Sequence, residues 1–217
     1  MTVDSWSRVD RLNRPYNLED SDFCFYYLRY TPYAGFQHSY ANQEVINYKI
    51  PIGSESGLAN RPGRAPYKQR AIENYATAII EFMSSKTLRN TSERLIDLGG
   101  RVGIVPAPTS MTPDDPEFDD RNVKTCQIVC GVTGFRLCRD VETVKYIGPS
   151  HSQGTRSPNL IKASLGRVAH GCDDCEFVFV IDDVLTTGAH FVAIKSLLLE
   201  SGCLAQVFGI FYAKSEL

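Results

Sequence analysis

The feature that most constrains the fold is the stretch VIDDVLTTGA at residues 180–189, which follows an apolar segment and precedes a helical pattern. Residues 177–181 are short, apolar and rich in β-branched side chains, which predicts a strand buried on both faces. Beyond Gly188, apolar residues recur at helical spacing, at Phe191, Ile194, Leu197 and Leu198. The stretch therefore predicts a strand, a tight loop and a helix in that order.

The residue types in this loop suit a sugar phosphate. The first N–H groups of the predicted helix, with the positive end of its dipole, point at whatever fills the loop. Asp182 and Asp183 can present oxygens to ribose hydroxyls or to a hydrated Mg²⁺, while Thr186 and Thr187 add hydroxyl donors. Gly188 lets the backbone approach a phosphate. The alternative is an Asp-Asp turn that caps a helix, but the complete order favours a ribose-5-phosphate site.

A second motif lies upstream, where residues 102–105 read as another short buried strand. The strand runs into a loop of five residues that is stiffened by proline and carries hydroxyls: Pro106, Ala107, Pro108, Thr109 and Ser110. Hydroxyls and loop N–H groups can bind an anion, although many such loops are simply turns. Its place upstream of the first motif favours a second anion-binding loop.

VIDDVLTTGA resembles the phosphoribosyl pyrophosphate (PRPP) signature of type I phosphoribosyltransferases. The resemblance implies that Asp182 and Asp183 hold the ribose 2′- and 3′-hydroxyls and contact Mg²⁺. It also implies two phosphate sites: pyrophosphate at the loop from Pro106 to Ser110, and the 5′-phosphate at Thr186, Thr187, Gly188, Ala189 and His190. His190 departs from the family, since many members have Thr there; it either donates to the phosphate or alters the pocket. Thr186 cannot act as a base near neutral pH, which disfavours a hypoxanthine-guanine type of enzyme.

The order of the following segments resembles the ComF-like branch of that family. Residues 111–121 carry five acids and end at Arg121, after which a helix is predicted at residues 122–131. We interpret the acidic stretch as a solvated loop. Residues 153–159 resemble the branch's flexible loop, which implies that Arg156 closes over the pyrophosphate and stabilises the charge that develops there. Lys162 and Arg167 are possible helpers; the alternative is that all three are surface cations.

Seven cysteines raise the question of metal or disulfides. An odd number, with no export signal in the sequence, favours reduced thiols. A structural zinc site needs four ligands, usually in paired short spacings, and the sequence has a single Cys-x-x-Cys, at Cys172 and Cys175. We therefore do not expect zinc, and we interpret Cys126 and Cys130 as small buried apolar side chains. ComF-like proteins often have an N-terminal zinc module, whereas Cys24 is the one cysteine in the first hundred residues.

The N-terminal part is rich in aromatic residues between Phe23 and Tyr40, which suggests a strand or hairpin. These rings either stack on an aromatic acceptor in a hood over the site or form the core of a small sheet, which general burial tendencies favour. Further along, we expect a short helix at residues 42–48, a loop at residues 53–66 and a long helix at residues 67–86. One face of the long helix should pack against the sheet that contains residues 102–105.

The fold class we predict is α/β: a type I phosphoribosyltransferase-like, doubly wound and mainly parallel sheet flanked by helices. Residues 1–64 form an N-terminal extension or hood, residues 65–217 form the α/β domain, and residues 204–212 are the last strand. The net charge of -2 and pI near 6.1 disfavour duplex nucleic acid as the main partner. No apolar run approaches the roughly 18 residues that span a bilayer, and no signal pattern is present, so we expect a cytoplasmic protein.

The expected activity is transfer of the 5-phosphoribosyl group from PRPP to a nitrogen acceptor, which we expect to be nucleobase-like. The reaction requires Mg²⁺ and releases pyrophosphate. The sequence does not identify the acceptor, and it leaves open whether the protein forms a homodimer. A second hypothesis is a non-catalytic PRPP-sensing regulator, motivated by His190 and the Arg-poor acidic loop. A third is an accessory or effector protein of a bacterial stress, defence or DNA-uptake system.

Overall fold

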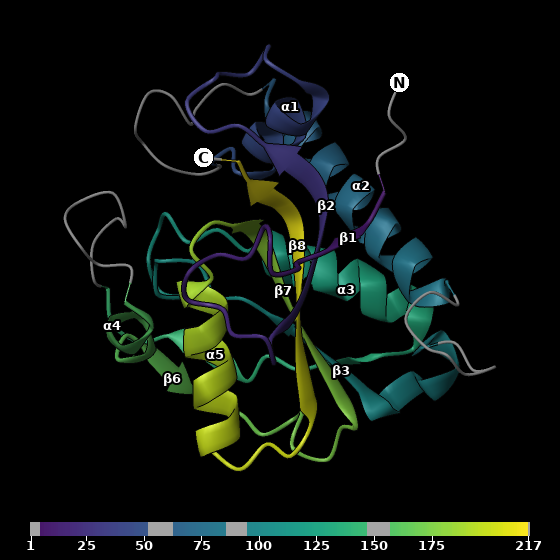
Figure 1. Cartoon of the computed structure of the whole chain (residues 1–217), viewed down its shortest axis with the longest axis vertical. Coiled ribbons are helices and arrows are strands. Elements are labelled where there is room, and N and C mark those ends of the chain that lie inside the picture. The colour runs from purple at the N-terminus through teal and green to yellow at the C-terminus, as the bar shows by residue number, and fades with distance from the viewer. Residues whose placement is uncertain (1–4, 52–62, 86–94, 147–156, 217) are drawn as a thin grey trace.

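A central sheet of six strands organises the computed structural model, which describes residues 5–51, 63–85, 95–146 and 157–216 (Figure 1). The strand order is β1-β2-β8-β7-β3-β4, and every neighbouring pair is parallel except β1 with β2. The bounds are β1 Ser7–Arg8, β2 Phe23–Tyr30, β8 Gln206–Ser215, β7 Phe177–Leu185, β3 Val102–Pro106 and β4 Arg136–Leu137. The fold is therefore mixed α/β with a mostly parallel sheet.

Helices cover both faces of this sheet. On one face, α1 (Tyr40–Tyr48), α2 (Ala65–Ser84) and α3 (Arg121–Thr133) share a core with Ile104, Phe179 and Ile181. On the other face, α5 (Ala189–Glu200) packs on Val105, Val178 and Val180. Successive residues of β7 thus enter different cores, because side chains alternate across a strand. This arrangement explains why the strand is apolar without polar alternation and is compatible with a doubly wound fold.

The remaining elements are short. The 3₁₀ helix η2 (Leu95–Arg101) leads into β3, and a separate antiparallel pair is formed by β5 (Val141–Thr143) and β6 (Leu165–Arg167). Helix α4 (Pro158–Lys162) is attached to α5 by an ion pair between Lys162 and Glu200 at 2.6 Å. Most of these elements lie at the α5 side of the sheet, away from α2 (Figure 1).

Several local signals explain where the helices begin and end. Ser39 caps α1, since its Oγ accepts from the Asn42 N–H at 3.1 Å. Proline stands in the first turn of α2, where its missing N–H costs nothing. Gly134 ends α3 in the left-handed conformation, with φ of 72°. These signals fix helix bounds within about two residues of those the sequence predicts.

The expected strands at residues 102–105, 177–181 and 204–212 and the helices at residues 42–48, 67–86 and 122–131 are confirmed, with shifted ends. The packing of α2 against the sheet is confirmed as well, because Ile72, Ile79 and Met83 share a core with Val102 and Ile104. Most of the expected loop at residues 53–66 lies outside the described residues.

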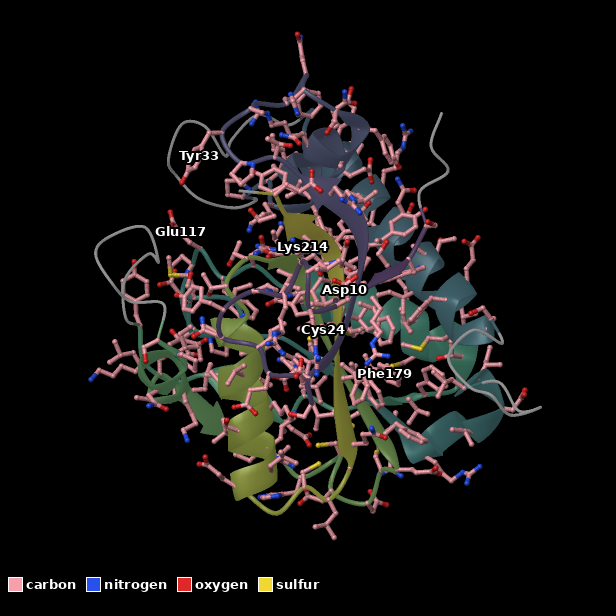
Figure 2. All side chains as sticks on the ribbon, in the orientation of Figure 1. Asp10, Cys24, Tyr33, Glu117, Phe179 and Lys214 are labelled. Atoms are coloured by element: carbon pink, nitrogen blue, oxygen red, sulfur yellow. The ribbon has the colours of Figure 1, made fainter. Side chains whose placement is uncertain are left out.

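The aromatic N-terminal segment differs from the expectation of a small separate sheet. It forms β2, which pairs in parallel with β8 and so belongs to the central sheet. Its side chains serve both cores, since Phe25 and Leu28 face α2 while Cys24 and Tyr26 face the α5 side. In Figure 2 the labelled Cys24 and Phe179 lie inside the molecule, whereas Tyr33 stands at its edge. The division of the chain at residue 64 stays a prediction, but both sides of it contribute to one sheet.

Tyr75 ties α2 to the two central strands. Its hydroxyl donates to the carbonyl oxygens of Asp182 in β7, at 2.9 Å, and Ile210 in β8, at 3.0 Å. Its ring stacks on Tyr212 with centroids 4.4 Å apart. Because Tyr75 is fully buried, water cannot replace these hydrogen bonds.

We expect Tyr75→Phe to lower the free energy of unfolding by about 1–3 kcal/mol, since it removes a buried donor and keeps the ring. Urea unfolding followed by circular dichroism measures this change. The control is Tyr67→Phe in the first turns of the same helix, where the side chain is exposed and the change should be within about 0.5 kcal/mol. Equal effects at the two positions would contradict the assigned role of the Tyr75 hydroxyl.

Candidate functional site

The two predicted loops lie side by side, because β3 and β7 are adjacent parallel strands. Pro106, the last residue of β3, is level with Ile181 in β7. The Ala107 N–H then donates to the Ile181 carbonyl at 2.9 Å, which fixes the start of the first loop beside Asp182 and Asp183. The carboxyl ends of parallel strands share one edge of a sheet, so both loops open at the same edge.

This edge contains the point where the chain changes sides. The helix that follows β3 is α3, which packs on one face of the sheet. The helix that follows β7 is α5, which packs on the other face. Between two such neighbouring strands the connections diverge, and in open α/β sheets this divergence is where ligands bind. Both predicted loops therefore border the crevice that the topology favours.

Asp182 is held by three donors. Its Oδ2 lies 2.8 Å from His190 Nδ1, and its Oδ1 accepts from the Asp183 N–H at 2.8 Å and from Asn122 Nδ2 at 3.4 Å. Burial lowers the pKa of His190, but the negative charge of Asp182 outweighs that effect and raises the pKa above its ordinary value. His190 is therefore a partner of Asp182 whose protonated form is favoured by this contact.

Asp183 is held by two cations from distant segments. Its Oδ2 lies 2.6 Å from Arg121 Nη2 and 3.1 Å from Lys49 Nζ. Burial favours the neutral acid, but the charges of Lys49 and Arg121 hold the pKa of Asp183 well below its usual range. Lys49 follows α1 directly, so the N-terminal part of the chain supplies one of the charges at this site (Figure 1).

Arg121 links the acidic loop to this site. It pairs with Asp119 as well as Asp183, and Lys68 Nζ lies 2.7 Å from Asp119 Oδ1. Asp119 and Asp183 raise the pKa of Arg121 although burial acts to lower it. The expectation that the acidic stretch is solvated is confirmed at Glu117, which is exposed (Figure 2). It is wrong at Asp119, which forms ion pairs with the two cations and is largely shielded from solvent.

The loop at residues 186–188 is crossed by the N-terminal segment. The Asn17 N–H and Nδ2 donate to the Thr187 carbonyl at 3.2 Å and 3.0 Å. Gly188 has φ of 79°, and a Cβ added there would lie 2.7 Å from two side-chain carbons of Leu18. Thr186 is exposed, and Thr187 Oγ1 accepts from the Ala189 N–H at 3.4 Å. Gly188, as the N-cap of α5, offers no side chain to the first-turn N–H groups.

The first loop carries a buried hydroxyl that has no partner. Within the described ranges, Thr109 Oγ1 is buried and makes no hydrogen bond, although the Thr109 carbonyl accepts from Thr143 Oγ1 at 2.6 Å. The Ala107 carbonyl accepts from Asn122 Nδ2 at 2.8 Å. Pro108 is half-buried and Ser110 is exposed. Because a buried hydroxyl without a partner is unfavourable, Thr109 is suited to an anion that enters this loop.

Of the basic residues predicted to reach the pyrophosphate, Lys162 and Arg167 are not brought to this site. Arg156 lies outside the described residues. Lys162 pairs with Glu200 at the end of α5 remote from Ala189. Arg167 pairs with Asp140 and Asp173. Conversely, sequence reasoning missed Lys49, Asp119 and Asn122, which stand outside both motifs; a lysine at the end of a predicted helix gives no local signal of an ion pair with Asp183.

The carboxylate oxygens offer the hard ligands that Mg²⁺ prefers, but each already accepts a hydrogen bond or an ion pair. Asp183 Oδ1 accepts from the Val184 N–H at 2.6 Å, and its Oδ2 faces Arg121 and Lys49. Asp182 is held by His190, Asn122 and a backbone N–H. The residues thus fit Mg²⁺ in donor type, although each carboxylate already has three hydrogen-bond or ion-pair contacts among its roughly four acceptor sites.

No protein-family model matches the chain, and no significant match is found among curated proteins. In the parts of the chain that the structure describes, no helix is both long and apolar enough to cross a membrane. Function is therefore inferred from the geometry of the two loops.

We expect Gly188→Ala to lower the free energy of unfolding by about 2–4 kcal/mol, because it adds left-handed strain and a clash with Leu18. The control is Gly35→Ala, where φ is 81° and a Cβ would meet nothing within 4 Å, so only the strain of about 1–2 kcal/mol applies. In a double-mutant cycle measured by urea unfolding, Leu18→Ala should reduce the cost of Gly188→Ala. Additive effects would contradict the contact between Leu18 and the loop.

We expect Arg121→Met to destabilise the protein by about 3 kcal/mol, since it leaves buried carboxylates with fewer partners. The control is Arg11→Met, whose pair with Asp20 has side chains 81% and 57% exposed, against 13% and 12% for Arg121 and Asp183; it should cost at most about 1 kcal/mol. The lowered pKa of Asp183 means that its stabilisation is present above its unfolded pKa of about 3.9 and lost as the pH falls. The gap between wild type and Arg121→Met should therefore narrow below about pH 4, and a constant gap would contradict this pairing.

Proposed function

We propose that the chain binds PRPP at the edge where β3 and β7 end, and transfers its 5-phosphoribosyl group to a nitrogen acceptor with release of pyrophosphate. The acceptor class we propose is a nucleobase-like molecule. One observation carries the proposal: the Asp182-Asp183 pair, the left-handed Gly188 at the start of α5, and the loop after β3 meet at the divergence point of the sheet. Each of these features suits a different part of PRPP.

The two loops divide the ligand by chemistry. The N–H groups at the start of α5, with Thr186 and Thr187, suit the 5′-phosphate. The unpartnered hydroxyl of Thr109 and the cation Arg121 suit the pyrophosphate. Asp182 and Asp183 suit the ribose hydroxyls as acceptors. Catalysis would come from positioning and from positive charge near the leaving pyrophosphate, since no covalent nucleophile is required.

Binding of the ribose exchanges partners at the acids. In the structure, Arg121 and Lys49 form ion pairs with Asp183, and His190 pairs with Asp182. When ribose hydroxyls take over the carboxylate oxygens, Arg121 and Lys49 become available to the pyrophosphate. Mg²⁺ would neutralise the pyrophosphate charge when bound. Because Mg²⁺ is usually bound by one or two carboxylates together with substrate phosphates, we propose that Mg²⁺ enters with PRPP and is not held by the acids alone.

The second candidate function is PRPP sensing without transfer. It is favoured by the ion pairs that occupy both carboxylates and by the contact of Asn17 and Leu18 with the Thr187-Gly188 loop. PRPP that displaced these contacts would move the N-terminal segment, and such a change suits a regulator. The two candidates share the binding site and differ in whether PRPP is consumed.

We expect calorimetric titration to show Mg²⁺-dependent binding of PRPP that the Asp182→Asn, Asp183→Asn double variant loses, because amides present N–H groups where ribose hydroxyls need acceptors. Mg²⁺ alone should give no binding heat at either variant or wild type. The matched control is Asp114→Asn in the exposed part of the acidic loop, which should bind as wild type does. Thermal melting of each variant verifies that it is folded.

Pyrophosphate release with a panel of nucleobases separates the two candidates. Release that depends on one base supports transfer, whereas PRPP binding without release for any base supports sensing. Equal PRPP affinity in wild type and in the folded double variant would contradict both candidates.

A further inference from the structure

Four cysteines gather at the end of the sheet opposite the candidate site. Cys138 directly follows β4, Cys172 and Cys175 lie in the connection that leads into β7, and Cys203 lies in the turn between α5 and β8, at the bottom of Figure 1. All four are buried in the core on the α5 side of the sheet, and all are free thiols. Segments far apart in sequence therefore place four thiols in one cluster.

The distances within this cluster are short. The Sγ atoms of Cys172 and Cys203 lie 3.7 Å apart. A Cβ added at Gly103 would lie 3.1 Å from Cys175 Sγ, 3.3 Å from Cys138 Sγ and 3.4 Å from Cys172 Cβ. Gly103 thus leaves the space that lets the thiols of Cys138 and Cys175 approach the strand. The backbone between Cys172 and Cys175 forms a turn, in which the Cys175 N–H donates to the Cys172 carbonyl at 3.1 Å.

A buried cation faces the cluster. The Arg167 side chain is 6% exposed, and its Nη2 lies 3.5 Å from Cys172 Sγ and 3.1 Å from Asp140 Oδ2. Within the described residues its Nη1 is buried and has no hydrogen-bond partner. Asp140 also accepts from the Cys172 N–H at 2.9 Å. A guanidinium with spare donor capacity at this place can offset part of the negative charge that metal-bound thiolates carry.

We propose that Cys138, Cys172, Cys175 and Cys203 bind one structural Zn²⁺ as thiolates. Zn–S bonds of about 2.3 Å in a tetrahedron put sulfurs about 3.8 Å apart, which the separation of Cys172 and Cys203 matches. In the described part of the chain, Cys138 and Cys175 lie outside the group of ligand atoms that are within 4.8 Å of one another, so their side chains must rotate toward Cys172 and Cys203 when the ion binds. On binding, four thiol protons leave to solvent, and the site carries two negative charges that Arg167 partly offsets.

Zinc is the ion that we assign to this cluster. A [2Fe–2S] cluster would instead place two cysteine ligands on each of two irons, and the metal analysis below distinguishes it from zinc. Asp173 Oδ lies within 4.8 Å of the Cys172 and Cys203 ligand atoms, but it pairs with Arg167 and His170, so we assign the fourth position to a thiol. The sequence shows one Cys-x-x-Cys, and the fold supplies the other two ligands.

Such a site would join the segment after β4 to the connections at the amino-terminal ends of β7 and β8. It would lock the turn after α5 to the loop before β7, and so support β7, which carries Asp182 and Asp183 toward its other end. Zinc binding at this cluster does not depend on PRPP, because the site consists of the cysteines and Arg167 alone.

The test is the zinc content of the full chain, purified without added metal or chelator and measured by inductively coupled plasma mass spectrometry. We expect about one zinc per chain, with most of it lost in Cys203→Ser. The matched control is Cys130→Ser in α3, a cysteine outside the cluster, which should keep its zinc. Cobalt exchanged into the wild type should give the intense visible bands and thiolate charge-transfer bands of a tetrahedral site.

Wild type without zinc, and without these cobalt bands after reconstitution, would overturn the proposal. Iron in place of zinc, or disulfides that survive under reducing purification, would overturn it too. Because the cobalt spectrum uses the wild type, the test stands even where Cys203→Ser fails to fold. A folded Cys203→Ser variant with its full zinc content would remove Cys203 from the site and contradict the four-thiolate assignment.

Discussion

The parallel pairing of β3 with β7 is the constraint on which both ends of the molecule depend. It places the end of β3 level with Ile181, so that the proline-rich loop and the two acids share an edge. At the other end, the same pairing sets Gly103 beside the cysteines that precede β7. Because β7 is buried on both faces, a slip of one residue in this register would place each of its side chains in the opposite core and would unpair Asp182 and Asp183 from their partners.

Electrostatics at the candidate site follow from that pairing. Two adjacent carboxylates at the end of a buried strand are unfavourable without counter-charges. The partners of the two carboxylates come from three elements of the chain: Lys49 after α1, Arg121 at the start of α3 and His190 at the start of α5. Binding of a sugar phosphate would therefore exchange these contacts: its hydroxyls would bind the carboxylate oxygens, and its phosphates would bind the cations that now pair with the carboxylates.

The sequence predicted those parts of the fold whose signal is local. The apolar run of β7, the periodicity of α2 and the Gly188 turn each depend on neighbouring residues, and each is found where expected. The pairing of β2 with β8 joins the two ends of the chain, so the aromatic segment could not be assigned to the central sheet from its own pattern. For the same reason Lys49, Asp119 and the proximity of Cys138 and Cys203 to Cys172 were not predictable. Arg156, which the family resemblance implies, stays a prediction.

The most direct measurement is a crystal structure of the protein with PRPP and Mg²⁺. We expect the 5′-phosphate to lie against the backbone N–H groups at the start of α5. The ribose hydroxyls should bind Asp182 and Asp183, and the pyrophosphate should lie near Thr109 and Arg121. The ion pairs of Asp183 with Lys49 and Arg121 should be rearranged. PRPP bound elsewhere would contradict the proposed site. Crystals grown at saturating PRPP would contradict it too if these ion pairs persisted and the crevice held no ligand.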